Sequence, residues 1–121
     1  MELLDIGREI LAKVSLLEKM RVEIRQRAEA KAEAGAAYDR ILAVTLLQLR
    51  NGKIFELDGE VVSGEKLPAN ILEKVAKGIT WQESMAADKA EALYKALISN
   101  IDAVQSELNG LQSLNKNLGS I

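Results

Sequence analysis

The sequence contains neither cysteine nor histidine. Disulfides, thiol nucleophiles, imidazole acid–base catalysis and ordinary zinc sites are therefore excluded. Aromatic residues make up only 3 % of the 121 residues, fewer than a β-sandwich or a compact α/β enzyme of this length would normally carry. The chain has 48 % hydrophobic and 28 % charged residues, and leucine and alanine are common. This composition predicts one mainly α-helical domain over residues 1–121.

A large excess of charge of one sign is also lacking, since the formal net charge is −2. A strongly basic nucleic-acid binder is disfavoured on this ground. No window approaches the ~18 uninterrupted apolar residues of a membrane span. The first ten residues carry charges of both signs, unlike a signal peptide. We therefore expect a cytoplasmic protein that does not contact a membrane, and nucleic acid is a disfavoured partner although a local basic patch remains open.

Residues 1–50 are predicted to form one long helix, because apolar positions recur at steps of three and four. The predicted buried stripe consists of Ile10, Val14, Leu17, Ile24, Ala28, Gly35, Tyr38, Leu42 and Leu49, and is interrupted by Arg21, Lys31 and Thr45. Small residues are dense from 28 to 37, and we expect Gly35 to mark a close contact or a slight kink. So long a helix must lie along a second helix, another subunit, or both.

The hydrophobic period changes after Asn51-Gly52, which is expected to end the first helix. In residues 51–67, two short β-rich runs flank Asp58-Gly59, a dipeptide that suits the positive φ angles of a tight hairpin turn. Pro68 is then expected to open a short helix over residues 68–78, with Gly78 in the position after its end. The sequence predicts a small β-hairpin and a short helix between two long helices.

A second long helix is predicted over residues 80–118. Thr80 and Glu83 have the spacing of a capping box, in which the Thr hydroxyl accepts from the Glu amide. The predicted seam contains Ala90, Tyr94, Leu97, Ile101, Val104, Leu108, Leu111, Asn115 and Leu118. Steps of four and three sustained over this distance are typical of a coiled coil. Asn115 is interpreted as a polar residue that sets the register.

The two long helices are expected to pair as an antiparallel hairpin. If Arg50 and Thr80 lie level at its tip, Tyr94 falls opposite Gly35 and Leu108 falls near Val22. In this register Val104 falls near Gln26 and Leu118 near Ala12. The first ten residues would overhang with Leu3, Leu4 and Ile6 unpaired, which predicts a homo-oligomer. The residues expected in packing or oligomer contacts are Leu3, Ile6, Ile10, Tyr38, Tyr94, Leu97, Ile101, Leu108 and Leu111.

Acidic residues on the second helix have a spacing that loosely resembles helical metal-dependent nucleotide pyrophosphatases. They are Glu83, Asp88, Glu91 and Asp102. That chemistry needs carboxylates on two facing helices to hold Mg²⁺, and the first helix offers only Asp39 at the right level. A solvated helix face is the favoured interpretation. We predict no catalysis, no metal and no cofactor.

Basic residues form two candidate sites. The stripe Arg21, Arg25, Arg27 and Lys31 alternates with glutamates, which favours a solvated flank over a nucleic-acid groove. The second group lies near helix ends and comprises Arg50, Lys53, Lys74, Lys77 and Trp81. Cations and helix ends favour anions, and Trp81 could stack on a base. The alternative, which we favour for Trp81, is that its ring fills the junction between the hairpin and the helices.

Three segments, 71–78, 90–97 and 108–115, are similar to a family of small, largely uncharacterised helical proteins of bacteriophages and prophages. Genes of this family tend to lie among early, recombination and single-strand-binding genes. The resemblance covers residues 38–118, and the Asp58-Gly59 hairpin resembles an insertion. The resemblance implies a phage origin and an accessory role in binding.

Two binding functions fit this resemblance. The favoured one is counter-defence, in which a homo-oligomer sequesters a nucleotide signal or blocks a host defence protein. It predicts a cationic pocket beside Trp81 or a tyrosine, and the tip cations and the single Trp occur together. The alternative is an accessory protein of phage DNA recombination or replication that binds protein or single-stranded DNA, and it predicts an exposed acidic or apolar groove.

Overall fold

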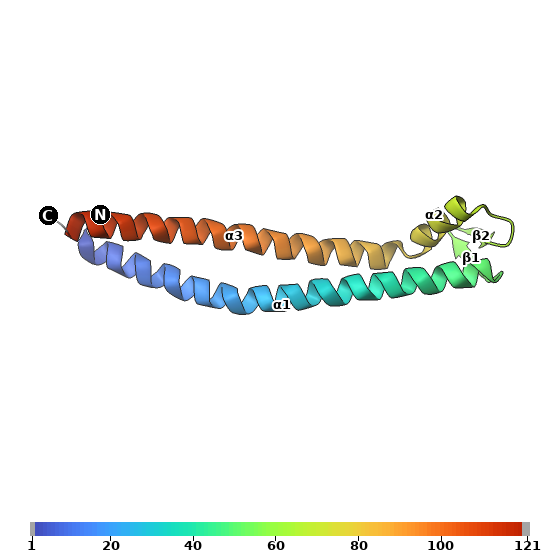
Figure 1. Ribbon diagram of the computed structural model, residues 1–121, viewed down its shortest axis with the longest axis horizontal. Coiled ribbons are helices and arrows are strands. Elements are labelled where there is room, and N and C mark those ends of the chain that lie inside the picture. Colours follow the sequence, from blue (N-terminus) through green and yellow to red (C-terminus); the bar gives the residue numbers. More distant parts are fainter. Residues whose placement is uncertain (1, 120–121) are drawn as a thin grey trace. The chain divides into compact units, whose positions relative to one another are not determined.

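The computed structural model describes residues 2–119, most of which are helical (Figure 1). The elements are helix α1 (Leu3–Arg50), strands β1 (Ile54–Leu57) and β2 (Glu60–Ser63), helix α2 (Ala69–Ile79) and helix α3 (Trp81–Gly119). The predicted order of long helix, β-hairpin, short helix and long helix is confirmed. The chain divides into two compact units. Unit 1 contains the described residues up to Glu29 and from Ala92 onward, and unit 2 is Ala30–Glu91.

In unit 1, α1 and α3 run antiparallel and side by side (Figure 1). Leu17, Val104 and Leu108 form its buried cluster, and Ile10, Met20 and Ile101 pack against them. The predicted seam of the second helix is confirmed, because all of its members are buried or half-buried. The seam faces α1 because a step of 3.5 residues keeps the same side turned to the partner helix.

The predicted register of the helix pair is wrong. Leu108 packs with Leu17, whereas Val22 is 62 % exposed. The prediction placed Arg50 level with Thr80, but in unit 2 Leu49 clusters with Leu72 and Ala76 of α2. The short helix α2 therefore packs against the last turns of α1, where the prediction had placed the start of α3.

The predicted overhang at the start of the chain is wrong for Ile6, which is completely buried. Leu3 and Leu4 are 51 % and 66 % exposed. Ile6 is buried because α3 lies further toward the start of α1 than predicted, with Leu108 at Leu17 instead of Val22, so that the two helices overlap to their ends in unit 1 (Figure 1).

The buried row of α1 differs in detail from the predicted stripe. Val14 is 37 % exposed and Ala28 is exposed, while the preceding residues Lys13 and Arg27 are half-buried in their place on the helix face. Lys31 and Thr45 do not interrupt the row: Lys31 is half-buried and Thr45 is 3 % exposed. Long Lys side chains can bury their methylene stems and keep the charge in water, which lets them occupy a seam.

Gly35 does not mark a close contact, because a Cβ added to it would meet no described atom within 4 Å outside the helix backbone nearby. Tyr38 and Tyr94 are both half-buried. The pairing of Tyr94 with Gly35 stays a prediction.

The end of α1 is a Schellman motif built on Gly52, whose φ is +88°. The Gly52 amide donates to the Leu49 carbonyl (3.1 Å) and the Lys53 amide donates to the Gln48 carbonyl (2.9 Å). These bonds satisfy carbonyls that have no partner within the helix. The predicted helix end at Asn51-Gly52 is confirmed.

The β-hairpin has the predicted turn, with φ of +50° at Asp58 and +82° at Gly59. Pairing of Phe55 with Val62 places both on one face of the hairpin, since residues opposite each other in antiparallel strands share a face. Phe55 packs against the cluster of Leu49, together with Leu42, Leu46, Leu67, Val75 and Ile79. The hairpin is thus held by the helices, as an isolated two-stranded sheet requires.

Gly64 connects the hairpin to α2 at a point of close backbone approach. A Cβ at this position would lie 2.5 Å from the Leu49 carbonyl oxygen and 2.5 Å from Leu72 Cδ1. Real Cβ atoms do not approach so closely, so the chain passes here only as glycine.

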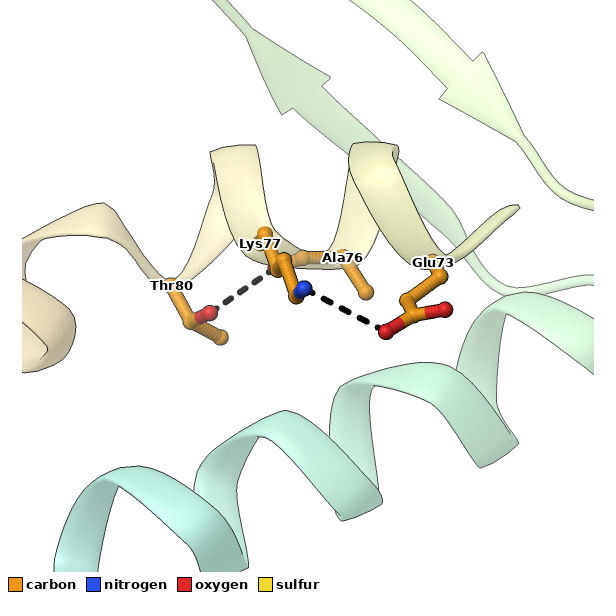
Figure 2. Close-up of polar contacts among 4 residues, drawn as sticks. All are labelled: Glu73, Ala76, Lys77 and Thr80. Carbon is orange, nitrogen blue, oxygen red and sulfur yellow. Dashed lines mark hydrogen bonds and ion pairs between the residues drawn. The ribbon is translucent and has the colours of Figure 1, made fainter. Parts of the chain in front are cut away.

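The junction of α2 and α3 departs from the prediction at two residues. Gly78 lies inside α2 instead of after its end, and a Cβ there would be 3.4 Å from Leu57 Cδ2. That distance is an ordinary contact, so the hairpin does not require a glycine here. The capping box is also wrong, because the buried Thr80 hydroxyl donates to the Ala76 carbonyl at 2.9 Å (Figure 2). Thr80 ends α2 and does not cap α3 with its side chain.

Candidate functional site

The four predicted ligand-binding cations lie on two helices and one loop of unit 2. Arg50 ends α1, Lys53 precedes β1, and Lys74 and Lys77 lie on α2. All four side chains are exposed. The structure gives two of them neighbours of their own.

Lys77 forms an ion pair within its helix, with Nζ 3.3 Å from Glu73 Oε1 one turn earlier (Figure 2). Lys53 Nζ lies 5.0 Å from the centroid of the Phe55 ring, a cation–π contact. An adjacent carboxylate reduces the positive potential that Lys77 offers to an anion. Two of the four cations are therefore already engaged by protein groups.

Trp81 is 52 % exposed at the start of α3. The prediction that its ring fills the junction is wrong, because Leu72, Ala76 and Thr80 are the buried residues there. Met85 follows one helical turn later and is 59 % exposed. Residues four apart lie on the same side of a helix, so Trp81 and Met85 form one exposed apolar pair.

Large exposed apolar side chains recur on the other elements of unit 2. With Trp81 and Met85, the exposed apolar set is Ile41, Val44 and Leu47 on α1, Ile54 and Val61 on the hairpin, and Ile71 on α2. Single exposed apolar residues are ordinary, and unit 1 also carries them. Neighbouring ones on a helix face indicate an interaction surface, as Trp81 with Met85 and Ile41 with Val44 do here. Periodicity alone did not reveal the set, because only the buried stripe of each helix had been sought.

The outer side of α1 in unit 2 carries an open hollow of about 420 Å³. It is lined by Ala37, Arg40, Ile41 and Val44. A hollow with walls from a single helix cannot enclose a small molecule, which usually buries most of its surface in a pocket. Its form suits an elongated neighbour such as another helix.

Unit 1 carries a hollow of about 340 Å³ with a charged rim. Its lining residues are Glu9, Lys13, Glu107, Gly110, Leu111 and Leu114. Lys13 and Glu107 form an ion pair between α1 and α3. The hydrogen bond and the charge of Glu107, with a smaller contribution from Glu9, raise the pKa of Lys13 above its ordinary value. This pair was not predicted, because the predicted register separated the two residues.

The basic stripe and the acidic residues of α3 are only partly solvated, because Arg27, Lys31, Glu83 and Glu91 are half-buried while the other members are exposed. Arg27 Nη2 lies 3.7 Å from Glu23 Oε1, which fits the solvated-flank interpretation of the basic stripe. Among residues 2–119, no three acidic side chains gather in a way that could hold a metal ion. Over the same residues, no helix has both the length and the apolar character to cross a bilayer.

Comparisons with known proteins found no match to any family model, any curated protein or any solved structure.

Proposed function

We propose that this chain is a helical binding protein that associates with itself and holds a protein partner without chemically changing it. The observation that carries the proposal is the exposed apolar set of unit 2. Withdrawing apolar surface from water contributes about 25 cal/mol per Å², so these side chains favour association over remaining solvated. They lie on α1, the hairpin, α2 and α3, which suits a macromolecular partner.

A protein partner is supported over a nucleotide by the character of the exposed residues. Trp81 and Met85 form an apolar pair, and Trp is enriched among residues that contribute most to protein interfaces. A nucleotide site would need cations converging on phosphate. Instead Lys77 pairs with Glu73, and Lys53 lies over Phe55.

The biological setting that we propose follows from the sequence resemblance alone. Similarity to small phage and prophage early-region proteins supports counter-defence, with a host defence protein as the partner. The alternative partner is a protein of phage DNA recombination or replication. In both cases the chain acts by occupying a surface of its partner.

A nucleotide screen separates protein binding from signal sequestration. Trp81 is the only Trp, so the intrinsic fluorescence of the chain reports on this residue directly. Cyclic dinucleotides, linear dinucleotides and ATP are expected to change neither the Trp81 emission nor the melting temperature. A saturable change with any of them would refute the protein-partner proposal, since ligand bound to the folded state must raise stability.

Self-association is tested by light scattering at increasing concentration of the full chain. We expect the weight-average mass to rise from that of the 13.2 kDa monomer. Exchange of Trp81 for Ala should reduce binding of a protein partner without unfolding the chain, because the side chain is half exposed. Gln82→Ala, at an exposed neighbour, is the matched control and should bind normally.

A further inference from the structure

Helix α1 carries a second apolar row in unit 2, separate from the row that packs in its core. The second row consists of Ala30, Ala34, Ala37, Ile41 and Val44, whose spacings alternate between four and three residues. It is rotated about a quarter-turn from the buried row at the usual 100° per residue. Ile41 and Val44 are 36 % and 39 % exposed, and Ala30 and Ala37 are exposed. Such spacing is that of a coiled-coil seam, and four of its five members are exposed, whereas Ala34 is half-buried.

We propose that this row is the interface between two copies of the chain, packed antiparallel about a two-fold axis at Ala37. The row is self-complementary in size when it is reversed on itself. Ala30 of one copy then lies opposite Val44 of the second copy, and Ala34 lies opposite Ile41. Small residues facing large ones let two helices interdigitate, and a two-fold interface requires one patch to fit itself in this way.

The ends of the row obey the same symmetry. Beyond Val44 the next step of four leads to Gln48, and the residue equally far from Ala37 on the other side is Gln26, whereas strict alternation of the steps would reach Arg27 there. In the antiparallel register Gln26 of one copy meets Gln48 of the second. Paired amides at both ends close the apolar row without leaving a charge unpaired.

Charge complementarity selects the antiparallel direction. Glu33 and Arg40 are one heptad apart, so they flank the row on the same side, and both are exposed. Antiparallel packing about Ala37 places Glu33 of each copy beside Arg40 of the second copy, twice by symmetry. Parallel packing would instead place each of these positions beside the position five residues later on the second copy, which sets Glu33 beside Tyr38 and forms neither ion pair. Neither residue forms an ion pair with another residue in the described part of the chain.

This interface rests on the proposed self-association and adds its surface, direction and register. About four turns of one helix against another make a small interface, at or below the ~1,200 Å² of weak complexes. We therefore expect a dimer that forms and dissociates with concentration. The hollow lined by Ala37, Arg40, Ile41 and Val44 is where the second helix lies.

Crosslinking through a single introduced cysteine tests the position of the axis. The chain has no cysteine, so Ala37→Cys can react only with the same residue of another copy. With a short bismaleimide, Ala37→Cys should give covalent dimer at least ~10-fold faster than the control Ala36→Cys. Ala36 is also an exposed alanine, but it lies on a different side of the helix. Equal rates at the two positions, or no dimer at either, would overturn the interface.

Charge exchange tests the direction. Glu33→Arg and Arg40→Glu each replace two attractive pairs by two repulsive ones, so each variant alone should dimerise about tenfold more weakly. Mixing the two variants should restore dimers, because the Glu33→Arg copy supplies only cations at these two positions and the Arg40→Glu copy supplies only anions. Failure of the mixture to recover would contradict antiparallel pairing.

The outcomes separate this interface from the proposed self-association. If light scattering shows a dimer but the cysteine and charge variants behave like their controls, the chain self-associates by another surface. If the chain is monomeric up to ~100 μM, a concentration at which weak complexes of this size still form, both proposals fail.

Discussion

The two units bury their apolar residues in different ways. In unit 1 the cluster of Leu17, Val104 and Leu108 is made by two helices alone. In unit 2 the cluster of Leu49, Leu72 and Ala76 is made by α1 and α2 and is covered by the hairpin through Phe55. The core of unit 1 is built from the same kind of contact repeated along a helix pair. The core of unit 2 forms only where α1, α2 and the hairpin meet.

This difference determines how well each unit tolerates substitution. In unit 1 any apolar side chain of suitable size at a seam position would preserve the packing. Unit 2 also needs a residue without a Cβ at Gly64, positive φ angles at Asp58 and Gly59, and a hydroxyl at Thr80. We therefore expect substitutions in unit 2 to be the more disruptive.

The largest expected effect is that of Leu49→Ala, which creates a cavity at a completely buried side chain. Such changes cost about 2–5 kcal/mol. Leu108→Ala should cost less, because Leu108 is 5 % exposed and its helix pair can close around the gap. Urea unfolding followed by circular dichroism measures both.

Leu47→Ala is the control for this comparison, since Leu47 is 57 % exposed on the same helix. It should change the unfolding midpoint little. Amide hydrogen exchange then sharpens the comparison, because Leu49→Ala should lower protection mainly within residues 30–91. Equal costs for Leu49→Ala and Leu108→Ala would show that the two clusters do not differ as described.

Gly64→Ala is expected to destabilise the chain next most strongly. The added methyl would overlap the Leu49 carbonyl and Leu72, and overpacking typically costs about 1–3 kcal/mol. Gly35→Ala is the matched control, because its methyl meets no described side chain within 4 Å and alanine favours the helix. Thermal melting should therefore shift down for the first variant and up for the second. A neutral Gly64→Ala would show that the backbone does not need this close approach.

Thr80→Val tests the hydroxyl at the junction of α2 and α3. Valine keeps the shape but removes the hydrogen bond to the Ala76 carbonyl, which should cost about 1 kcal/mol. Thr80→Ser retains the hydroxyl and should recover most of that loss. If Thr80→Ser is no more stable than Thr80→Val, the hydrogen bond is not what Thr80 contributes.

The smallest expected effect belongs to the ion pair of Lys13 and Glu107 in unit 1. Surface pairs of this kind contribute little, so Lys13→Met should lower stability only slightly at neutral pH. The pKa of Lys13 is raised above its ordinary 10.5 by Glu107. The contribution is therefore fully present below that ordinary value and is lost as the pH rises through the raised one.

Urea unfolding at pH 7 and above pH ~11 checks the sign of this effect. The difference between the parent chain and Lys13→Met should disappear at the higher pH. Lys19→Met, at an exposed position of the same helix, is the control. A stability difference between the parent chain and Lys13→Met that grows with pH would contradict the raised pKa of Lys13.

The elements of the fold could be predicted because each depends on neighbours in sequence. The seam of α3, the Asp58-Gly59 turn and the helix end at Gly52 all follow from local spacing or backbone preference. The register could not be predicted in the same way. It depends on Leu49 packing with Leu72, and nothing in the local pattern says that α2 folds back along α1.

The candidate site was predictable in part for the same reason. The exposure of Arg50, Lys53, Lys74 and Lys77 follows from their charge, but the partner of Lys77 depends on which face of α2 is solvated. The second row of α1 was visible in the spacing of Ala30 to Val44. It could be recognised as a separate surface only from the structure, which leaves Ile41 and Val44 exposed. The buried or half-buried side of α1 in this unit carries Tyr38, Leu42, Thr45 and Leu49.

The contacting residues are closer in sequence in one cluster than in the other, and this difference has a consequence for the order of folding. Leu49 and Leu72 are joined by a short connection, whereas Leu17 and Leu108 are joined by most of the chain. Closing a short loop costs less entropy, and contacts between near neighbours form sooner. The hairpin and α2 would dock on α1 first, and α1 and α3 would then pair progressively toward the termini. In stopped-flow experiments, Leu49→Ala should slow refolding, while Leu108→Ala should mainly speed unfolding.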